Sequence, residues 1–167
     1  MRNDISLELA SRLTEQVKTA FENGSLLDAV TPVTQDLLKF WFMGPYTEER
    51  SKNFHEGQKQ SILNIIYLHE VLQVTTVEEI YRQVAPDLLA ECNLSDLAKE
   101  KYRIPKYAVK MATGTGKTWV MHALLLWQLL NGRHEEQEER SGRYTQNFLI
   151  VAPGLIVYDR LKDAYCG

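Results

Sequence analysis

One stretch near the middle of the chain constrains the fold more than any other, namely Lys110-Met111-Ala112-Thr113-Gly114-Thr115-Gly116-Lys117-Thr118. An extended run, residues 106–111, leads into the glycines, and an apolar run, residues 119–127, follows them. Strand, loop and helix in this order are what a P-loop requires. The sequence therefore predicts a loop that binds phosphate groups between a strand and a helix.

The residue types in this loop suit phosphate binding. Gly114 and Gly116 give the backbone conformations that other residues avoid, so successive N–H groups can turn toward phosphate oxygens. A helix that starts near Gly116 adds its unpaired N–H groups and the positive end of its dipole. Lys117 supplies a positive charge for the β- and γ-phosphates, and the Thr118 hydroxyl suits Mg²⁺. Lys117 and Thr118 are thus the predicted catalytic residues, with Thr118 as the metal ligand. The predicted cofactor-binding residues of the loop are Thr113, Gly114, Thr115, Gly116, Lys117 and Thr118.

The strict P-loop pattern differs from this chain at one position, because it has glycine where Met111 stands. We weigh this departure as minor. A glycine-threonine turn that only caps a helix is the alternative interpretation. The extended run before the loop and the apolar run after it favour phosphate binding.

Composition sets broader limits on the protein. The 167 residues are 44% hydrophobic and 25% charged, which is ordinary for one globular domain. A net charge of -3 gives no overall basic field for nucleic acid. Cys92 and Cys166 lack the spacing of a disulfide framework or a zinc site. Without an apolar leader or a long apolar run, the chain is expected to be cytoplasmic, with no membrane contact.

The histidines give no sign of a catalytic arrangement. His55, His69 and His122 are scattered along the chain, and no nucleophile stands at a telling distance from any of them. Each of these three residues is therefore expected to be structural.

Apolar periodicity predicts a helical amino-terminal region. Ile5, Leu9, Leu13, Val17 and Phe21 share one face of a helix that Asn23-Gly24 would end. Further helices are expected at residues 31–42, with proline in the first turn, at 63–72, and at 75–91, with Thr75 or Thr76 as the N-cap.

After the helix that follows the glycine loop, the sequence predicts a surface loop, a strand and a further helix. Residues 132–143 are highly charged and are expected to form a solvated surface loop. The continuous apolar run from Phe148 to Ala152, closed by Pro153-Gly154, predicts a strand buried on both faces of a parallel sheet. Another helix is expected from Leu155 to Tyr165.

Two stretches carry a resemblance to a known family. Residues 111–118, together with the run from Phe148 through Pro153-Gly154 to Asp159-Arg160-Leu161, resemble motifs I and Ia of superfamily 2 helicases. Within that superfamily the chain is most similar to the restriction (Res) subunit of type III restriction-modification enzymes. The second stretch has Ala152 where that family usually has threonine. Pro153 and Gly154 are the residues that the resemblance places against nucleic acid.

The family also has a glutamine before motif I that reads the adenine edge, with an apolar residue four positions later. Gln58 and Ile62 fit this spacing, and Phe54 would be an aromatic neighbour. Gln60 is the competing candidate. An amide suits the role, because it both donates and accepts hydrogen bonds with adenine N6 and N7.

The resemblance implies an α/β fold, an incomplete RecA-like parallel sheet preceded by a helical amino-terminal region. Residues 1–50 would form the helical region, and residues 51–167 the first part of an ATP-binding lobe that stops before the Walker B strand. The cofactors would be ATP and Mg²⁺, and the partners would be DNA and a methyltransferase that supplies sequence specificity. In the full-length protein, ATP hydrolysis would drive DNA translocation linked to DNA cleavage.

Phosphoryl transfer also needs a carboxylate on a second strand to hold Mg²⁺. The run at residues 148–152 ends in Ala-Pro instead of aspartate, so the chain alone is expected to bind ATP poorly and to hydrolyse hardly any. We therefore expect an amino-terminal piece of a longer enzyme. Two alternatives stay open: another P-loop protein, such as a kinase or GTPase, and a non-catalytic interaction module with a vestigial loop.

Overall fold

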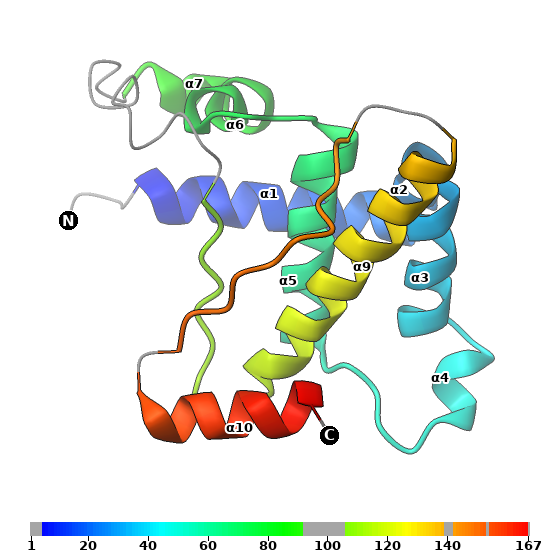
Figure 1. The fold of residues 1–167 in the computed structure, drawn as a ribbon. Helices are drawn as coiled ribbons and strands as arrows, with labels where there is room; N and C mark the ends of the chain where they lie inside the picture. The colour runs from blue at the N-terminus through cyan, green and yellow to red at the C-terminus, as the bar shows by residue number, and fades with distance from the viewer. Residues whose placement is uncertain (1–4, 92–105, 139–141, 153, 167) are drawn as a thin grey trace.

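The regular elements of the protein are helices (Figure 1). The computed structural model describes residues 5–91, 106–138, 142–152 and 154–166. None of the helices in these ranges is both long and apolar enough to cross a lipid bilayer. The elements are α1 (Ile5–Glu22), α2 (Ser25–Ala29), α3 (Pro32–Phe42), α4 (Tyr46–Glu49), α5 (Glu56–Ile66), the π-helix η1 (Tyr67–Val71), α6 (Val77–Val84), α7 (Pro86–Leu89), α9 (Lys117–Gln137) and α10 (Leu155–Cys166).

The predicted parallel sheet is wrong. Residues 106–111 and 148–152 are extended, but neither segment forms a strand, and the described part of the chain holds no sheet. A strand exists through backbone hydrogen bonds to a neighbour about 4.8 Å away. No such bond joins these two segments among the described residues. The apolar run at 148–152 is consequently exposed, with Leu149 and Val151 at 89% and 80% of full accessibility.

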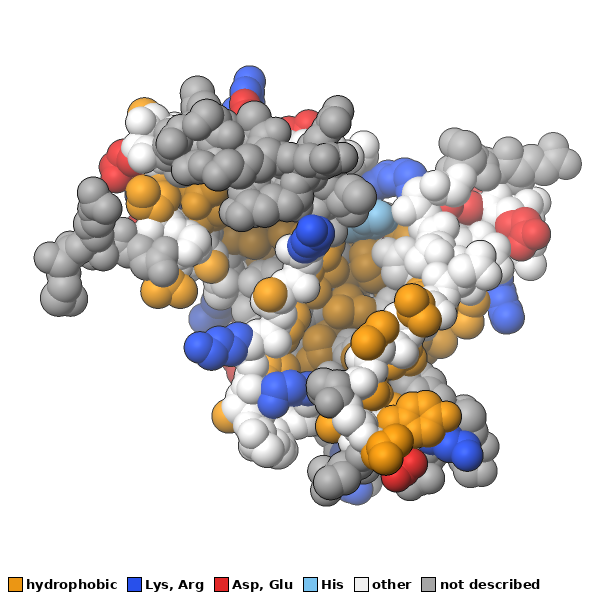
Figure 2. All heavy atoms as spheres, turned by 60° about the vertical axis from the view of Figure 1, so that its left-hand side comes forward, with side chains coloured by type: hydrophobic (Ala, Val, Ile, Leu, Met, Phe, Trp, Pro, Cys, Tyr) orange, Lys and Arg blue, Asp and Glu red, His pale blue; other side chains and the backbone are white. Residues whose placement is uncertain are grey.

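Both extended segments line one cavity of about 580 Å³. Tyr107, Val109 and Met111 contribute from the first segment and Phe148 from the second, while the opposite wall comes from α5, η1 and α9. Figure 2 shows apolar side chains gathered in a recess in the middle of this face. A cavity therefore separates the two extended segments from the helices, whereas a sheet would pack directly against them.

The predicted amino-terminal helices are confirmed. Helix α1 begins at Ile5 and ends beside Gly24, whose φ of 84° marks the turn. Leu13 and Val17 are buried along its predicted face. Helix α3 begins at Pro32, and the Thr31 side chain caps it by accepting a hydrogen bond from Thr34 N.

Two predicted boundaries need correction. The helix expected at residues 75–91 is divided into α6 and α7, because Ala85 precedes a proline and leaves the helical region, with φ −149° and ψ 67°. Thr76 is its N-cap, in a reciprocal capping box with Glu79. The loop expected from Gly132 starts later, because α9 continues through this glycine to Gln137.

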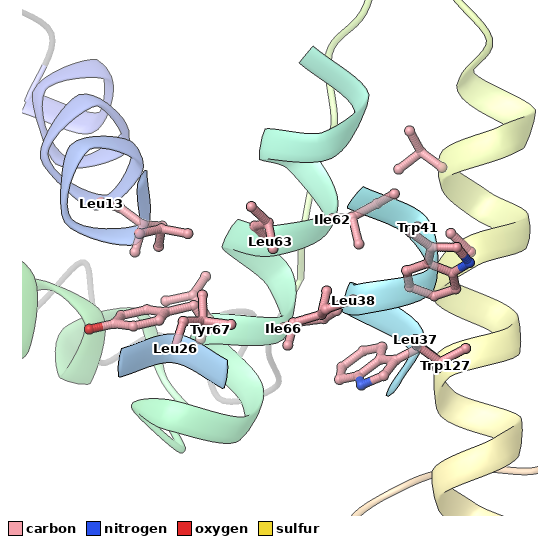
Figure 3. Close-up of a cluster of buried hydrophobic side chains, with 14 of the residues drawn as sticks. Leu13, Leu26, Leu37, Leu38, Trp41, Ile62, Leu63, Ile66, Tyr67 and Trp127 are labelled. Carbon is pink, nitrogen blue, oxygen red and sulfur yellow. The ribbon is translucent and has the colours of Figure 1, made fainter. Parts of the chain in front are cut away.

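One apolar core connects the amino-terminal helices with α9 (Figure 3). Helices α5 and α9 lie side by side, with α1 packed on α5, α3 on α9 and α2 on η1. A smaller cluster joins the start of α1 to α6 and α7. The largest fully buried apolar side chains are Val17, Leu26, Leu38, Ile62, Leu63 and Ile66.

A buried carboxylate holds three elements of this core together. Glu70, on η1, is only 4% exposed and accepts hydrogen bonds from Thr31 N (2.8 Å), Thr34 Oγ1 (2.5 Å) and Trp127 Nε1 (2.7 Å). Asn131, one helical turn after Trp127, donates through Nδ2 to Thr34 Oγ1 at 2.9 Å. These bonds tie α9 to the beginning of α3, mostly through buried groups, where hydrogen bonds matter most.

Replacement of Glu70 by alanine should strongly destabilise the fold. The change removes the carboxylate that accepts from Thr31 N, Thr34 Oγ1 and Trp127 Nε1, and only the indole keeps another acceptor, Thr34 Oγ1 at 3.0 Å. We therefore expect a loss of about 3 kcal/mol in the free energy of unfolding, measured by urea denaturation. Asp36→Ala removes an exposed carboxylate from α3 and should cost less than about 0.5 kcal/mol. Similar losses in the two variants would contradict the role of Glu70.

His69 should make stability depend on pH. Burial lowers the pKa of His69, and the positive charge of Arg143 lowers it further. Below the ordinary value of 6.5, the unfolded chain takes up a proton that the folded chain resists, so the free energy of unfolding falls as the pH falls. In His69→Phe, which keeps a ring against Trp127, this loss between about pH 7 and about pH 5 should be smaller. An equal loss in both proteins would contradict this expectation.

Candidate functional site

The glycine loop lies directly before α9, as the sequence predicts. Gly114 and Gly116 have φ angles of 81° and 73°, in the left-handed region that side chains disfavour. Gly116 is the residue before the first helical position, and α9 begins at Lys117. The first N–H groups of α9 therefore open onto the loop, together with the positive end of a 21-residue helix.

Gln58 fastens this loop to the start of α5. Its Nε2 donates to Thr115 O at 3.0 Å and to Gly116 O at 3.2 Å. Its Oε1 accepts from His55 N at 2.9 Å, and the side chain is only 6% exposed. A Cβ atom on Gly116 would lie 2.4 Å from Gln58 Nε2. Gly116 is thus required both by its backbone conformation and by the closeness of Gln58.

His55 also contacts the carbonyl of Thr115. Its Nε2 lies 2.9 Å from Thr115 O, while its Nδ1 accepts from Gln58 N at 3.4 Å. The side chains of His55 and Gln58 also form a reciprocal capping box at the start of α5. We refer to the contacts of His55 and Gln58 with Thr115 O and Gly116 O as the carbonyl clamp.

The upstream side of the loop is closed by the carbonyl of Ala112. It accepts from Thr115 Oγ1 at 2.7 Å and from Lys117 Nζ at 2.8 Å. The ammonium group of Lys117 therefore reaches back over the loop instead of extending into solvent. A phosphate oxygen would be a stronger acceptor for this ammonium than a neutral carbonyl, because both partners would then be charged.

Aromatic rings connect the first turn of α9 with the amino-terminal helices. Trp119 meets the edge of Phe54 at a centroid distance of 5.7 Å, and Phe54 contacts Phe42 at 5.5 Å and Trp41 at 6.2 Å. Trp119 is still 48% exposed. An exposed indole face therefore lies two residues beyond Lys117.

The structure brings some of the predicted site residues together. Gln58 contacts Thr115 and Gly116 directly, whereas Thr113 is exposed on the loop. Thr118 follows Lys117 in the first turn of α9. Within the described ranges, no group of three or more His, Cys, Asp or Glu side chains is placed to hold a metal ion.

Of the two residues predicted to contact nucleic acid, the structure describes Gly154. Gly154 is exposed just before α10, and its carbonyl accepts a hydrogen bond from Tyr158 N at 2.9 Å. No hydrogen bond among the described residues joins Gly154 to the glycine loop. Pro153 lies outside the described residues.

Sequence reasoning missed the contact of His55 with the loop. The scattered positions of the histidines favour structural roles, and they say nothing of which histidine lies beside the glycines. The usual signature of a capping box is serine or threonine three positions before glutamate or glutamine. Histidine in that first position gives no such signal, and the contact of His55 spans 60 residues.

The two loop glycines should differ in their tolerance of alanine. Gly114→Ala introduces only backbone strain of about 1 to 2 kcal/mol, because nothing lies within 4 Å of the added Cβ. Gly116→Ala adds to similar strain the displacement of the Gln58 amide, with loss of its hydrogen bonds to Thr115 O and Gly116 O, so it should cost about 1 kcal/mol more. Thermal unfolding of both variants measures this difference. Equal stability of the two would show that Gln58 does not approach Gly116 this closely.

Comparison with known proteins identifies the family. The family model described as "Type III restriction enzyme, res subunit" matches residues 51–166, well over half of the chain. The matched range contains the carbonyl clamp, the glycine loop and α9. No curated protein and no solved structure matches the chain. The match confirms the resemblance seen in the sequence, and the chain belongs to the family of type III restriction enzyme res subunits.

Proposed function

We propose that residues 113–118 form the ATP site of a DNA helicase or translocase of a type III-like restriction enzyme. In the full-length protein, ATP hydrolysis would drive movement along DNA that is linked to DNA cleavage. The observation that carries the proposal is the glycine loop at the start of α9, inside the range that matches the family. Family membership supports a role in a restriction enzyme, and the glycine loop supports the binding of a nucleotide.

The geometry of the loop fits a triphosphate. Space around Gly114 is open, with no atom within 4 Å of the position that a Cβ would take, so a phosphate oxygen can approach the backbone. The left-handed conformations at Gly114 and Gly116 are those that let consecutive N–H groups form an anion-binding concavity. The helix that follows adds unpaired N–H groups on the same side.

Lys117 and Thr118 have distinct roles in this proposal. Lys117 exchanges Ala112 O for an oxygen of the β- or γ-phosphate, and its charge stabilises the negative charge there. Thr118 presents its hydroxyl to Mg²⁺ bound with the nucleotide. When bound, Mg²⁺ would neutralise phosphate charge and assist phosphoryl transfer.

Gln58 supports a preference for adenine. Its two Nε2 hydrogens are directed to Thr115 O and Gly116 O, and its Oε1 accepts one bond, from His55 N. An amide oxygen has two lone pairs, so Gln58 Oε1 can accept one more hydrogen bond. Both hydrogens of Nε2 are already used, so Gln58 has no further hydrogen to donate. Adenine offers an amino group at the position where guanine offers a carbonyl oxygen. Gln58 would therefore accept a bond from adenine and repel guanine.

DNA and a methyltransferase subunit complete the proposal as partners. Pro153 and Gly154 would contact the DNA backbone, since they precede α10, whose first N–H groups are suited to a phosphate. Sequence specificity would come from the methyltransferase. Both partners rest on family membership.

MgATP should stabilise the chain against heat, and Lys117→Ala should reduce this effect. Ligand that binds the folded state raises the melting temperature in proportion to its saturation of the site. We expect a measurable shift at millimolar MgATP and at least about tenfold weaker binding in Lys117→Ala, since a charged hydrogen bond is lost. MgGTP should give a smaller shift than MgATP.

The alternatives predict different results in the same assay. A kinase-like or GTPase-like protein would bind MgGTP as well as MgATP, or better. A vestigial loop would give no shift with either nucleotide, in the wild type or in Lys117→Ala. Either result would overturn the proposed ATP site.

A further inference from the structure

We propose that His55 is a positioning residue of the phosphate-binding loop, which it shapes together with Gln58 through the carbonyl clamp. The inference rests on the proposed function, because it concerns how that loop is held ready for phosphate. His55 itself need not touch the nucleotide. Its effect is to fix the direction of two backbone N–H groups at the start of α9.

The clamp acts on two consecutive peptide groups. Thr115 O receives both His55 Nε2 at 2.9 Å and Gln58 Nε2 at 3.0 Å. Gly116 O receives Gln58 Nε2 at 3.2 Å and Trp119 N at 3.0 Å. Both carbonyls of the turn into α9 are therefore held by donors, and those from α5 come from one rigid helix start with a complete capping box.

Because peptide groups are planar, fixing the two carbonyls also fixes the direction of the N–H groups that follow them. In a trans peptide the C=O of one residue and the N–H of the next point to opposite sides. With Thr115 O directed at α5, the N–H of Gly116 points away from α5. With Gly116 O directed the same way, the N–H of Lys117 also points away. The clamp therefore presents two donors on the open side of the loop, where a phosphate oxygen would bind.

His55 can complete the clamp in one neutral tautomer. Thr115 O accepts hydrogen bonds but cannot donate, so Nε2 must carry the ring proton. In a neutral ring this leaves Nδ1 as the acceptor, and Gln58 N, which donates to His55 O at 3.0 Å, lies within 3.4 Å of it. The geometry thus assigns the Nε2-protonated form to His55, which NMR can test in the absence of any nucleotide.

A purely structural role of His55 as the N-cap of α5 is the alternative, and serine separates the two. Serine is among the best N-cap residues and can also pair with Gln58 in a capping box. Its side chain is too short to reach Thr115 O across the space that the imidazole ring fills. His55→Ser should therefore keep the cap of α5 and lose the half of the clamp that His55 provides.

The test compares the wild type, His55→Ser and His134→Ser in the full 167-residue chain. Calorimetry with MgATP and with magnesium tripolyphosphate, which has no base, measures phosphate binding. We expect His55→Ser to bind both ligands about fivefold to tenfold more weakly, the factor for one hydrogen bond. Its melting temperature without ligand should stay within about 2 °C of the wild type. His134→Ser, near the far end of α9, should match the wild type in both affinities.

Two results would overturn the inference. One is wild-type affinity of His55→Ser for both ligands, and the other is an Nδ1-protonated His55 ring in the ¹⁵N spectrum of the wild type. If the wild type binds neither ligand, the proposed function fails, and the spectrum alone decides the clamp. An Nε2-protonated ring then supports the contact with Thr115, and an Nδ1-protonated ring removes it.

Discussion

The position of α9 depends on a carboxylate buried among the helices. Glu70 accepts bonds from the backbone of Thr31, the hydroxyl of Thr34 and the indole of Trp127, so it fixes α9 against η1 and α3 at once. The fit of apolar side chains also holds these helices, but the hydrophobic effect itself has no direction. Hydrogen bonds in a desolvated core do have direction. The glycine loop directly precedes α9, so its position depends on this anchor.

The carbonyl clamp is the second anchor, and it lies on the same pair of helices. Gln58 and Glu70 are twelve positions apart on α5 and η1, whereas their partners Gly116 and Trp127 are eleven positions apart. Both helices run in the same direction (Figure 1), so one additional residue must be absorbed in the first. A π-helical turn contains more residues than an α-helical turn, and η1 lies within the longer span. The π-helix is thus the part of the longer span in which the additional residue can be accommodated.

The sequence predicted what depends on local chemistry. The periodicity of residues 5–21, the Thr31 cap before Pro32 and the glycines before Lys117 each act through neighbouring residues, and the structure has all three as expected. The prediction of a sheet was wrong because a strand needs a neighbouring strand to pair with. The apolar run at 148–152 indicates only that this segment would suit a strand if such a neighbour were present. The carbonyl clamp and the hydrogen bonds around Glu70 could not be predicted, since their contacts span 36 to 97 residues.

The absence of a sheet in the described residues changes what holds the glycine loop. In a loop that follows a paired strand, the ladder fixes the upstream side. Here residues 106–111 have no ladder in the described structure, and the upstream side is closed by the bonds of Ala112 O with Thr115 and Lys117. A ligand that draws Lys117 to its phosphates removes one of these bonds, whereas the clamped downstream side keeps its contacts with α5. Binding would therefore loosen the loop at Ala112 and leave the two N–H donors at the start of α9 in place.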